Sequence, residues 1–293
     1  MEPKEAAAVT REHLQMYRPG SHDAVANALQ DTWVRAAPPE GEALARDWGI
    51  DDADYPAVGV PVPVLRAIGK EVGKRAGRDV EGYLPLVRLL WDEYGREGRL
   101  VAAVALGPME LARPEEIVPL LYELAQGCAF WEDCDQLAMK ALEPILRKEP
   151  DAWLERLGAW VEDDNKWVRR AALTAIGRLP MEQPAYTARC VELLAPALGD
   201  PDRDVKRALS FALRVSARGE IEAVKGFIRD QRQVSDADSL WVLCDVIRSM
   251  TKKYLSDLVD LLPIYHAWLD SAEPKARRSV EGAVRTLERA AAS

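Results

Sequence analysis

The sequence predicts an all-α protein, a right-handed α-solenoid (alpha-alpha superhelix) in which helix pairs stack one on the next. The first observation is that amphipathic stretches of about 12–18 residues run almost from end to end, separated by short breaks with Pro, Gly or Asp. The second is that apolar residues fall at helical spacing and β-strand patterns are nearly absent, as in Val80, Leu84, Val87 and Leu90. The third is an internal repeat.

The repeat aligns residues 168–171, Val-Arg-Arg-Ala, with residues 205–208, Val-Lys-Arg-Ala, at a period of 37 residues. An Asp-rich turn precedes both segments, which suits the N-terminus of a helix, and Ala-rich turns follow, which let a neighbouring helix approach. This pattern is typical of the second helix of a HEAT-like repeat. Because one helix pair cannot bury its apolar face alone, such pairs stack into a solenoid whose second helices line the inner surface.

The elements follow from the breaks, taken in chain order. Helices at about 4–17 and 22–36 form an N-terminal cap within residues 1–45, and residues 51–60 form a loop. The chain is expected to be one repeat domain over residues 1–293, with additional C-terminal helices in residues 235–293. The helices after the cap are expected at 61–76, 80–93, 96–110, 114–126, 130–148, 150–162, 166–178, 184–197, 202–217, 219–230, 236–250, 253–269 and 274–291.

Charge is distributed unevenly along the chain. The net charge of −9 argues against a surface coated for nonspecific nucleic-acid binding. Residues 1–199 carry 23 basic and 33 acidic side chains, whereas residues 200–293 carry 16 and 15. A polyanion can therefore bind locally if the basic residues of the C-terminal part share one face.

Several classes of protein are excluded by composition. No apolar run approaches the ~20 residues that span a bilayer, and the polar, acidic N-terminus is no signal peptide. The four cysteines include no Cys-x-x-Cys pair and are expected to be buried thiols of a cytoplasmic protein. Three dispersed histidines do not form a metal site, so we expect neither metal nor cofactor.

Two clusters pair a tryptophan with a charged side chain. Trp131 and Asp135 are spaced i, i+4 on one helix face, where an indole ring and a carboxylate can bind a cationic group. The alternative is a core tryptophan beside an aspartate that complements the helix dipole. Trp167 and Arg170 follow Lys166, and Arg170 is suited to bidentate contact with phosphate. The alternative there is a solvated arginine pair facing nearby aspartates.

A third cluster is a basic stripe that contains an aromatic ring. Arg207, Phe211, Arg214 and Arg218 follow 4-3-4 spacing, with Lys206 beside them, which is plausible chemistry for contact with a nucleic-acid backbone. The alternative is a basic face common to the repeats, with Phe211 in the core. No phosphate loop, nucleophile elbow, zinc spacing or serine triad accompanies these clusters.

Together these residues resemble the HEAT-like repeat DNA alkylation repair proteins, the AlkD family of alkylpurine DNA glycosylases. The resemblance covers about residues 45–220. It is carried by Tyr55–Arg66, similar to the family's G-V-p-x-p-x-l-R; by Trp131 and Asp135, similar to W-x-x-x-D; by Trp167 and Arg170, similar to W-x-x-R; and by residues 207–214. In the last segment the family's second tryptophan is replaced by Phe211.

The resemblance implies hydrolysis of the N-glycosidic bond of N3- or N7-alkylated, cationic purines in double-stranded DNA, without metal or cofactor. It implies that Asp135 stabilises the oxocarbenium-like sugar, between the rings of Trp131 and Phe211. It also implies a set of cations that hold the DNA backbone, namely Lys166, Arg170, Lys206, Arg207 and Arg214. All of these residues are expected on the inner surface of a monomeric solenoid, acting in the cytoplasm on the nucleoid.

Two other functions stay open. Because Phe211 keeps a π face but lacks the area and N–H of an indole, the chain could be a noncatalytic binder of DNA structures within the same family. The overall acidic balance also fits a HEAT-repeat scaffold that binds protein.

Overall fold

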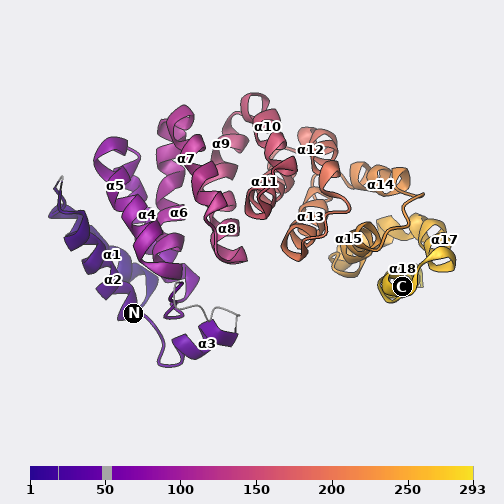
Figure 1. Cartoon of the computed structure of the whole chain (residues 1–293), viewed down its shortest axis with the longest axis horizontal. Helices are drawn as coiled ribbons and strands as arrows, with labels where there is room; N and C mark the ends of the chain where they lie inside the picture. Colours follow the sequence, from indigo (N-terminus) through magenta and orange to yellow (C-terminus); the bar gives the residue numbers. More distant parts are fainter. Residues whose placement is uncertain (19, 48–54, 293) are drawn as a thin grey trace. The chain divides into compact units, whose positions relative to one another are not determined.

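The computed structural model describes residues 1–18, 20–47 and 55–292, and within these ranges the regular structure is helical, with no β-strand (Figure 1). The all-α prediction is therefore confirmed. The helices group into two compact units, Met1–Ile145 (unit 1) and Leu146–Ser293 (unit 2). Whether the chain is one repeat domain with a cap at 1–45 and additional helices at 235–293 stays a prediction.

In unit 1, α4 packs between α1 and α6, and α6 packs on α8 and the π-helical turn that continues it. A second row contains α2, α5 and α7, in which α2 packs on α5 and both α5 and α7 pack on α6. The helices are α1 Pro3–Gln15, α2 His22–Val34, α3 Gly41–Asp47, α4 Val62–Ala76, α5 Val80–Glu93, α6 Gly95–Ala112, α7 Pro114–Gln126, α8 Trp131–Leu137 and the π turn Ala138–Leu142, followed by α9 Glu143–Lys148 at the unit boundary.

Small residues explain the close packing of α4 on α6. A Cβ atom added at Gly69 of α4 would lie 2.8 Å from the carbonyl oxygen of Val101. Ala102 and Ala105 of α6 are themselves fully buried. A glycine of α4 and alanines of α6 thus let the two helices pack closely.

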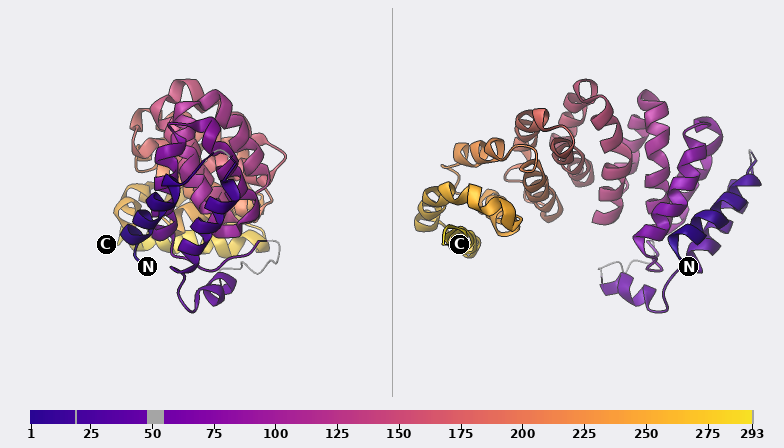
Figure 2. Two further views of the ribbon diagram at one scale, coloured as in Figure 1. Left: turned by 90° about the vertical axis from the view of Figure 1, so that its left-hand side faces the viewer. Right: turned by 180° about the vertical axis from the view of Figure 1, so that it is seen from behind.

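In unit 2, α11, α13, α15 and α18 form one row in which each packs on the next, and α10, α12 and α14 form a second row (Figure 2). The helices are α10 Pro150–Gly158, α11 Lys166–Arg178, α12 Thr187–Leu194, α13 Arg203–Ser216, α14 Ile221–Asp230, α15 Ala237–Arg248, α16 Lys252–Leu255, α17 Leu262–Ser271 and α18 Pro274–Ala291. Short 3-10 turns join them at Ala159–Glu162, Leu179–Met181, Pro184–Tyr186, Ala195–Ala197 and Ser256–Leu261.

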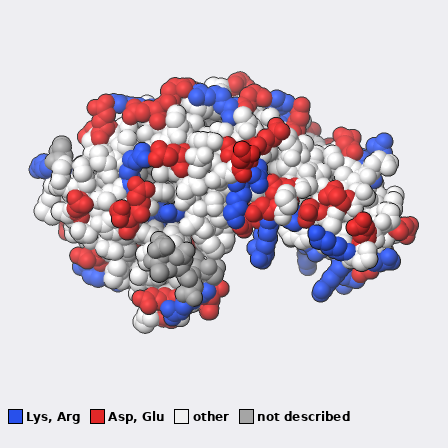
Figure 3. Space-filling model, viewed as in Figure 1, with Lys and Arg blue, Asp and Glu red and all other residues white. Residues whose placement is uncertain are grey.

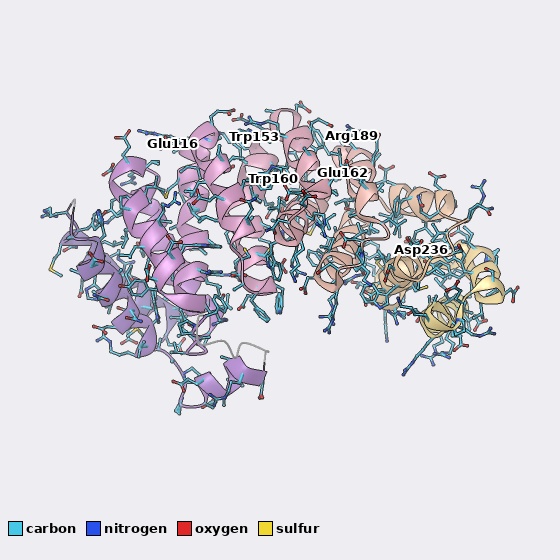
Figure 4. The ribbon with its side chains drawn as sticks, viewed as in Figure 1. Glu116, Trp153, Trp160, Glu162, Arg189 and Asp236 are labelled. Carbon is cyan, nitrogen blue, oxygen red and sulfur yellow. The ribbon has the colours of Figure 1, made fainter. Side chains whose placement is uncertain are left out.

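The row of α11, α13 and α15 begins each helix in the same way. The side-chain oxygens of Asn165, Asp202 and Asp236 accept backbone N–H groups of the first turn, at 2.8, 2.7 and 2.8 Å. Asp236 is labelled at the start of α15 in Figure 4. The predicted capping by Asp-rich turns is confirmed, with Asn165 instead of the preceding aspartates as the cap of α11.

The predicted helices are present, with five differences. The helix expected at 130–148 contains the π turn, and that at 253–269 is divided by a 3-10 turn. The helix expected at 150–162 ends in a 3-10 turn, and that at 184–197 begins and ends in 3-10 turns. Helix α3 was not predicted. Of the expected loop 51–60, residues 51–54 lie outside the described residues, and 55–60 contain no helix.

Two expectations from composition can be compared with the fold. The cysteines are free and buried, as predicted, and burial raises the pKa of Cys190 and Cys244 to about 12. In the described ranges, no helix combines the length and apolar character that crossing a membrane requires.

Candidate functional site

The first cluster lies at the N-terminus of α8. Trp131 is the first residue of the helix and its side chain is 42% exposed, which excludes the alternative of a core tryptophan. Its ring centroid lies 5.3 Å from that of Phe130. Asp135 follows one helical turn later and is half-buried. Unit 1 therefore presents an indole face and a carboxylate on the same short helix.

A cavity of about 440 Å³ lies beside Trp131, entirely within unit 1. Its walls are mainly apolar and aromatic, and include Leu44, Val62, Phe130 and Trp131. Among the described residues, its charged walls are the side chains of Arg96 and Glu132, which bind each other. The space in front of Trp131 is thus suited to a flat, weakly polar group.

Arg96 neutralises one of the two acids that precede Asp135. Its Nε and Nη2 donate to the two carboxylate oxygens of Glu132, at 2.7 and 3.2 Å. Its Nη1 donates to Glu97 at 2.9 Å and to the carbonyl of Val60 at 3.1 Å. Arg96 is 1% exposed and Glu97 is 2% exposed. This buried network fastens the loop before α4 to α6 and to the start of α8.

Arg99, one turn further along α6, neutralises the other acid. Its Nη1 lies 2.7 Å from Oδ2 of Asp133. The Asp133 carboxylate also accepts backbone N–H groups of residues 129, 130 and 134, so it caps α8 from within. Burial raises the pKa of Asp133, opposed by Arg99 and these N–H groups. Glu132 and Asp133 therefore do not act as two extra free charges beside Asp135.

Arg96 and Arg99 are not among the site residues predicted from the sequence. Their partners lie 36 and 34 residues away along the chain. The available signal was the i, i+3 spacing of two arginines at the start of a helix rich in apolar residues, which predicts a buried partner for each.

The second cluster lies at the start of α11 in unit 2, where cations already have partners. Lys166 Nζ lies 3.2 Å from Asp204 and 4.4 Å from the centroid of the Trp167 ring. Arg169 binds Asp200 at 2.7 Å. Arg170 is 7% exposed, and its Nη1 donates to the carbonyl of Asp204 at 2.7 Å. Arg169 also donates to the carbonyls of Asp163 and Asp164, so it faces the nearby aspartates as the alternative expects, whereas Arg170 is buried.

The third cluster lies on α13 and is more accessible. Lys206 is paired with Asp238 at 2.6 Å, but Arg207 is exposed and has no ion pair within the described part of the chain. Phe211 is half-exposed instead of buried in the core, and the Arg214 guanidinium lies 5.9 Å from its centroid. Burial lowers the pKa of Arg214, whose buried Nε has no acceptor among the described residues.

The structure groups the predicted residues by unit. Trp131 and Asp135 lie together in unit 1, and the predicted backbone-binding cations lie together with Phe211 on α11 and α13 of unit 2. Convergence of these groups on one inner surface stays a prediction. Among the described residues, no group of three or more His, Cys, Asp and Glu side chains could hold a metal ion.

Comparison with known proteins identifies a family. Residues 42–240, more than half of the chain, match the model of a family described as DNA alkylation repair enzyme. No curated protein matches the chain. The matched range includes both α8 and the two basic clusters, and it ends within α15.

Proposed function

Because the chain belongs to the DNA alkylation repair enzyme family, we propose that it acts as a glycosylase that removes N3- or N7-alkylated purines from duplex DNA. Family membership implies a role in alkylation repair and a DNA substrate. The glycosylase reaction, the purine lesion and the residue roles below are our proposal.

The proposed chemistry needs little from the protein. Alkylation at N3 or N7 makes the base cationic, so the base is already a good leaving group. As the N-glycosidic bond lengthens, positive charge develops on the deoxyribose, and a nearby carboxylate stabilises it. Asp135 has this role, and it can also orient the water that attacks the sugar. The faces of Trp131 and Phe211 stabilise the same cation through their π electrons.

One observation carries this proposal: an exposed Trp131 stands one turn before Asp135, while the adjacent acids are held by buried arginines. The ion pairs of Glu132 with Arg96 and of Asp133 with Arg99 hold this short helix in place. It also limits the negative charge at the site, so that cationic substrate is attracted without several free carboxylates repelling the DNA backbone.

The DNA backbone is proposed to bind the cations of α11 and α13. Arg207 is exposed and can contact a phosphate without breaking an ion pair among the described residues. Arg214 must break a long hydrogen bond of 3.4 Å to the carbonyl of Ser249 before it can contact a phosphate. Lys166, Arg170 and Lys206 contribute less, because each must first leave an aspartate side chain or carbonyl. Backbone contacts of this kind hold the duplex without reading its sequence.

We also propose that the helix rows of the two units belong to a right-handed solenoid of HEAT-like repeats. Its support is that alternate helices pack on one another within each unit, as α11, α13, α15 and α18 do. A monomer that works in the cytoplasm on nucleoid DNA is consistent with this proposal.

The test is base release from duplex DNA that contains 7-methylguanine. The full chain is incubated with the duplex, the free base is measured by chromatography, and abasic sites are measured by strand cleavage in alkali. Release of 7-methylguanine with formation of abasic sites supports the proposal. DNA binding without release supports the noncatalytic binder, and absence of both supports the protein scaffold.

A further inference from the structure

Unit 2 contains a basic pocket beyond the range that matches the family. The pocket has a volume of about 550 Å³ and lies where the end of α15, α16 and the C-terminal half of α18 meet. Arg248, Lys252 and Arg289 line it, together with Ser256 and Thr286. Among the described residues, no Asp or Glu lines this pocket. In a chain of net charge −9, three cations around one cavity without an acid point to an anionic ligand.

Packing connects this C-terminal basic pocket to the basic stripe of α13. Arg214 Nη1 donates to the carbonyl of Ser249, the residue that follows Arg248 at the end of α15. On the other side of α15, the stem of Arg248 crosses α18 at a glycine, since a Cβ added at Gly282 would lie 3.0 Å from Arg248 Cδ. Basic residues therefore succeed one another on three helices packed in one row, α13, α15 and α18.

In the other row of unit 2, the cations of α12 and α14 form ion pairs with carboxylates. Arg189 of α12 binds Glu155 at 2.6 Å and is labelled on the upper edge of unit 2 in Figure 4. Lys225 and Arg229 of α14 both bind Asp260. In contrast, Lys and Arg side chains project from the lower edge of unit 2 below α13, α15 and α18 (Figure 3). In the α13 row, Lys206, Arg248 and Arg277 also bind carboxylates, so what distinguishes this row is the exposed Arg207, for which the described residues provide no ion pair.

We propose that the C-terminal basic pocket binds a phosphate group of the duplex DNA backbone and so extends the DNA contact beyond residues 42–240. This inference rests on the proposed function, because it assumes that the α13 row binds DNA. Guanidinium groups bind two phosphate oxygens at once, and ammonium and hydroxyl groups add single contacts. Arg248 now binds Asp245 at 3.1 Å; if it turns to a phosphate, Asp245 keeps its 2.7 Å hydrogen bond from Ser210.

The experiment compares two double variants of the full chain that lose the same charge. Lys252→Gln with Arg289→Gln removes two cations that line the pocket. The matched control, Lys253→Gln with Arg277→Gln, removes one exposed Lys and one exposed Arg that do not line it. Affinity for unmodified duplex DNA is measured by fluorescence anisotropy over a range of salt concentrations, and thermal melting checks that each variant is folded.

The pocket variant is expected to reduce the slope of log K against log salt by about 0.9, which is the contribution of one neutralised phosphate. The control is expected to change the slope by less than half as much. Equal slopes for wild type and pocket variant, with wild-type DNA binding and base release intact, overturn this inference alone. A wild type that neither binds DNA nor releases base overturns the proposed function and this inference together.

A second arm distinguishes DNA from a small phosphorylated ligand. Inorganic phosphate is titrated into wild type and pocket variant and followed by calorimetry. Phosphate binding that only the wild type shows, together with a reduced DNA slope in the variant, supports a backbone phosphate as the ligand. The same phosphate binding with an unchanged DNA slope assigns the pocket to a free phosphorylated ligand and overturns the duplex contact.

Discussion

The arginines of α6 and those of α13 differ in what surrounds them, although both belong to candidate sites. Arg96 and Arg99 of α6 are buried or nearly so and bind the carboxylates of Glu132 and Asp133. Arg207 of α13 is exposed and has no ion pair among the described residues, and Arg214 beside it donates to the carbonyl of Ser249 and lies near the ring of Phe211. Arg96 and Arg99 therefore stabilise the fold, whereas Arg207 and Arg214 can bind an external anion.

A basic residue in a sequence motif therefore indicates a function only when its partner in the folded structure is known. An arginine whose charge is satisfied inside the protein contributes to folding, and its removal leaves a buried acid. An exposed arginine contributes little to folding but can neutralise phosphate. The comparison therefore predicts separate losses of stability and of DNA affinity.

The largest expected effect is on folding. Arg96→Gln leaves Glu97 buried without its cation, so the free energy of unfolding is expected to fall by about 3–5 kcal/mol. Arg88→Gln is the matched control, since Arg88 forms an exposed pair with Glu123 and should cost about 0–1 kcal/mol. Urea unfolding followed by circular dichroism measures both. Equal losses would show that burial of Arg96 is not what distinguishes α6.

The next effect is on DNA affinity. Arg207→Gln with Arg214→Gln is expected to weaken duplex binding at least tenfold and to lower the salt slope by about 2. Lys166→Gln with Lys206→Gln removes the same charge from cations that already bind aspartates, so the slope should fall by less than about 1. Anisotropy titrations provide the slopes. A larger loss in the lysine variant would reverse the assignment of the available cations.

The smallest effect is expected at the ring of α13. Phe211→Ala should slow base release by about two- to fivefold, which corresponds to one exposed cation–π contact. Phe211→Trp enlarges the π face and should raise the rate by a smaller factor. Single-turnover release of 7-methylguanine measures both variants at saturating protein. If neither variant changes the rate, Phe211 does not face the reacting sugar.

The helices could largely be predicted from the sequence because their signals are local. Asp202 and Asp236 begin α13 and α15 as the capping pattern indicates. The π turn of 138–142 could not be predicted from local signals, because it lies where helix α6 packs closely against it. A Cβ atom added at Gly107 of α6 would lie 2.2 Å from the carbonyl oxygen of Lys140. The break before α17 has a local signal, because Pro263 lies in the first turn of that helix, where proline is favoured.

The candidate site was predictable in part for the same reason. Trp131 and Asp135 lie within one helical turn, so their spacing alone places them on one face. Arg170 donates a hydrogen bond to the carbonyl of Asp204, 34 residues away. This contact depends on how α11 packs on α13, so no pattern in the sequence predicts it. Phe211 is half-buried, which its spacing in the sequence did not indicate.

The central claim is that Asp135 supplies the negative charge for base release, and one variant tests it most directly. Asp135→Asn keeps the shape of the side chain, and Asp92→Asn removes an exposed carboxylate of α5 as a control. We predict that Asp135→Asn lowers single-turnover release of 7-methylguanine by at least ~100-fold, while its Kd for the duplex stays within about twofold of wild type. Release at the wild-type rate by Asp135→Asn would contradict the account.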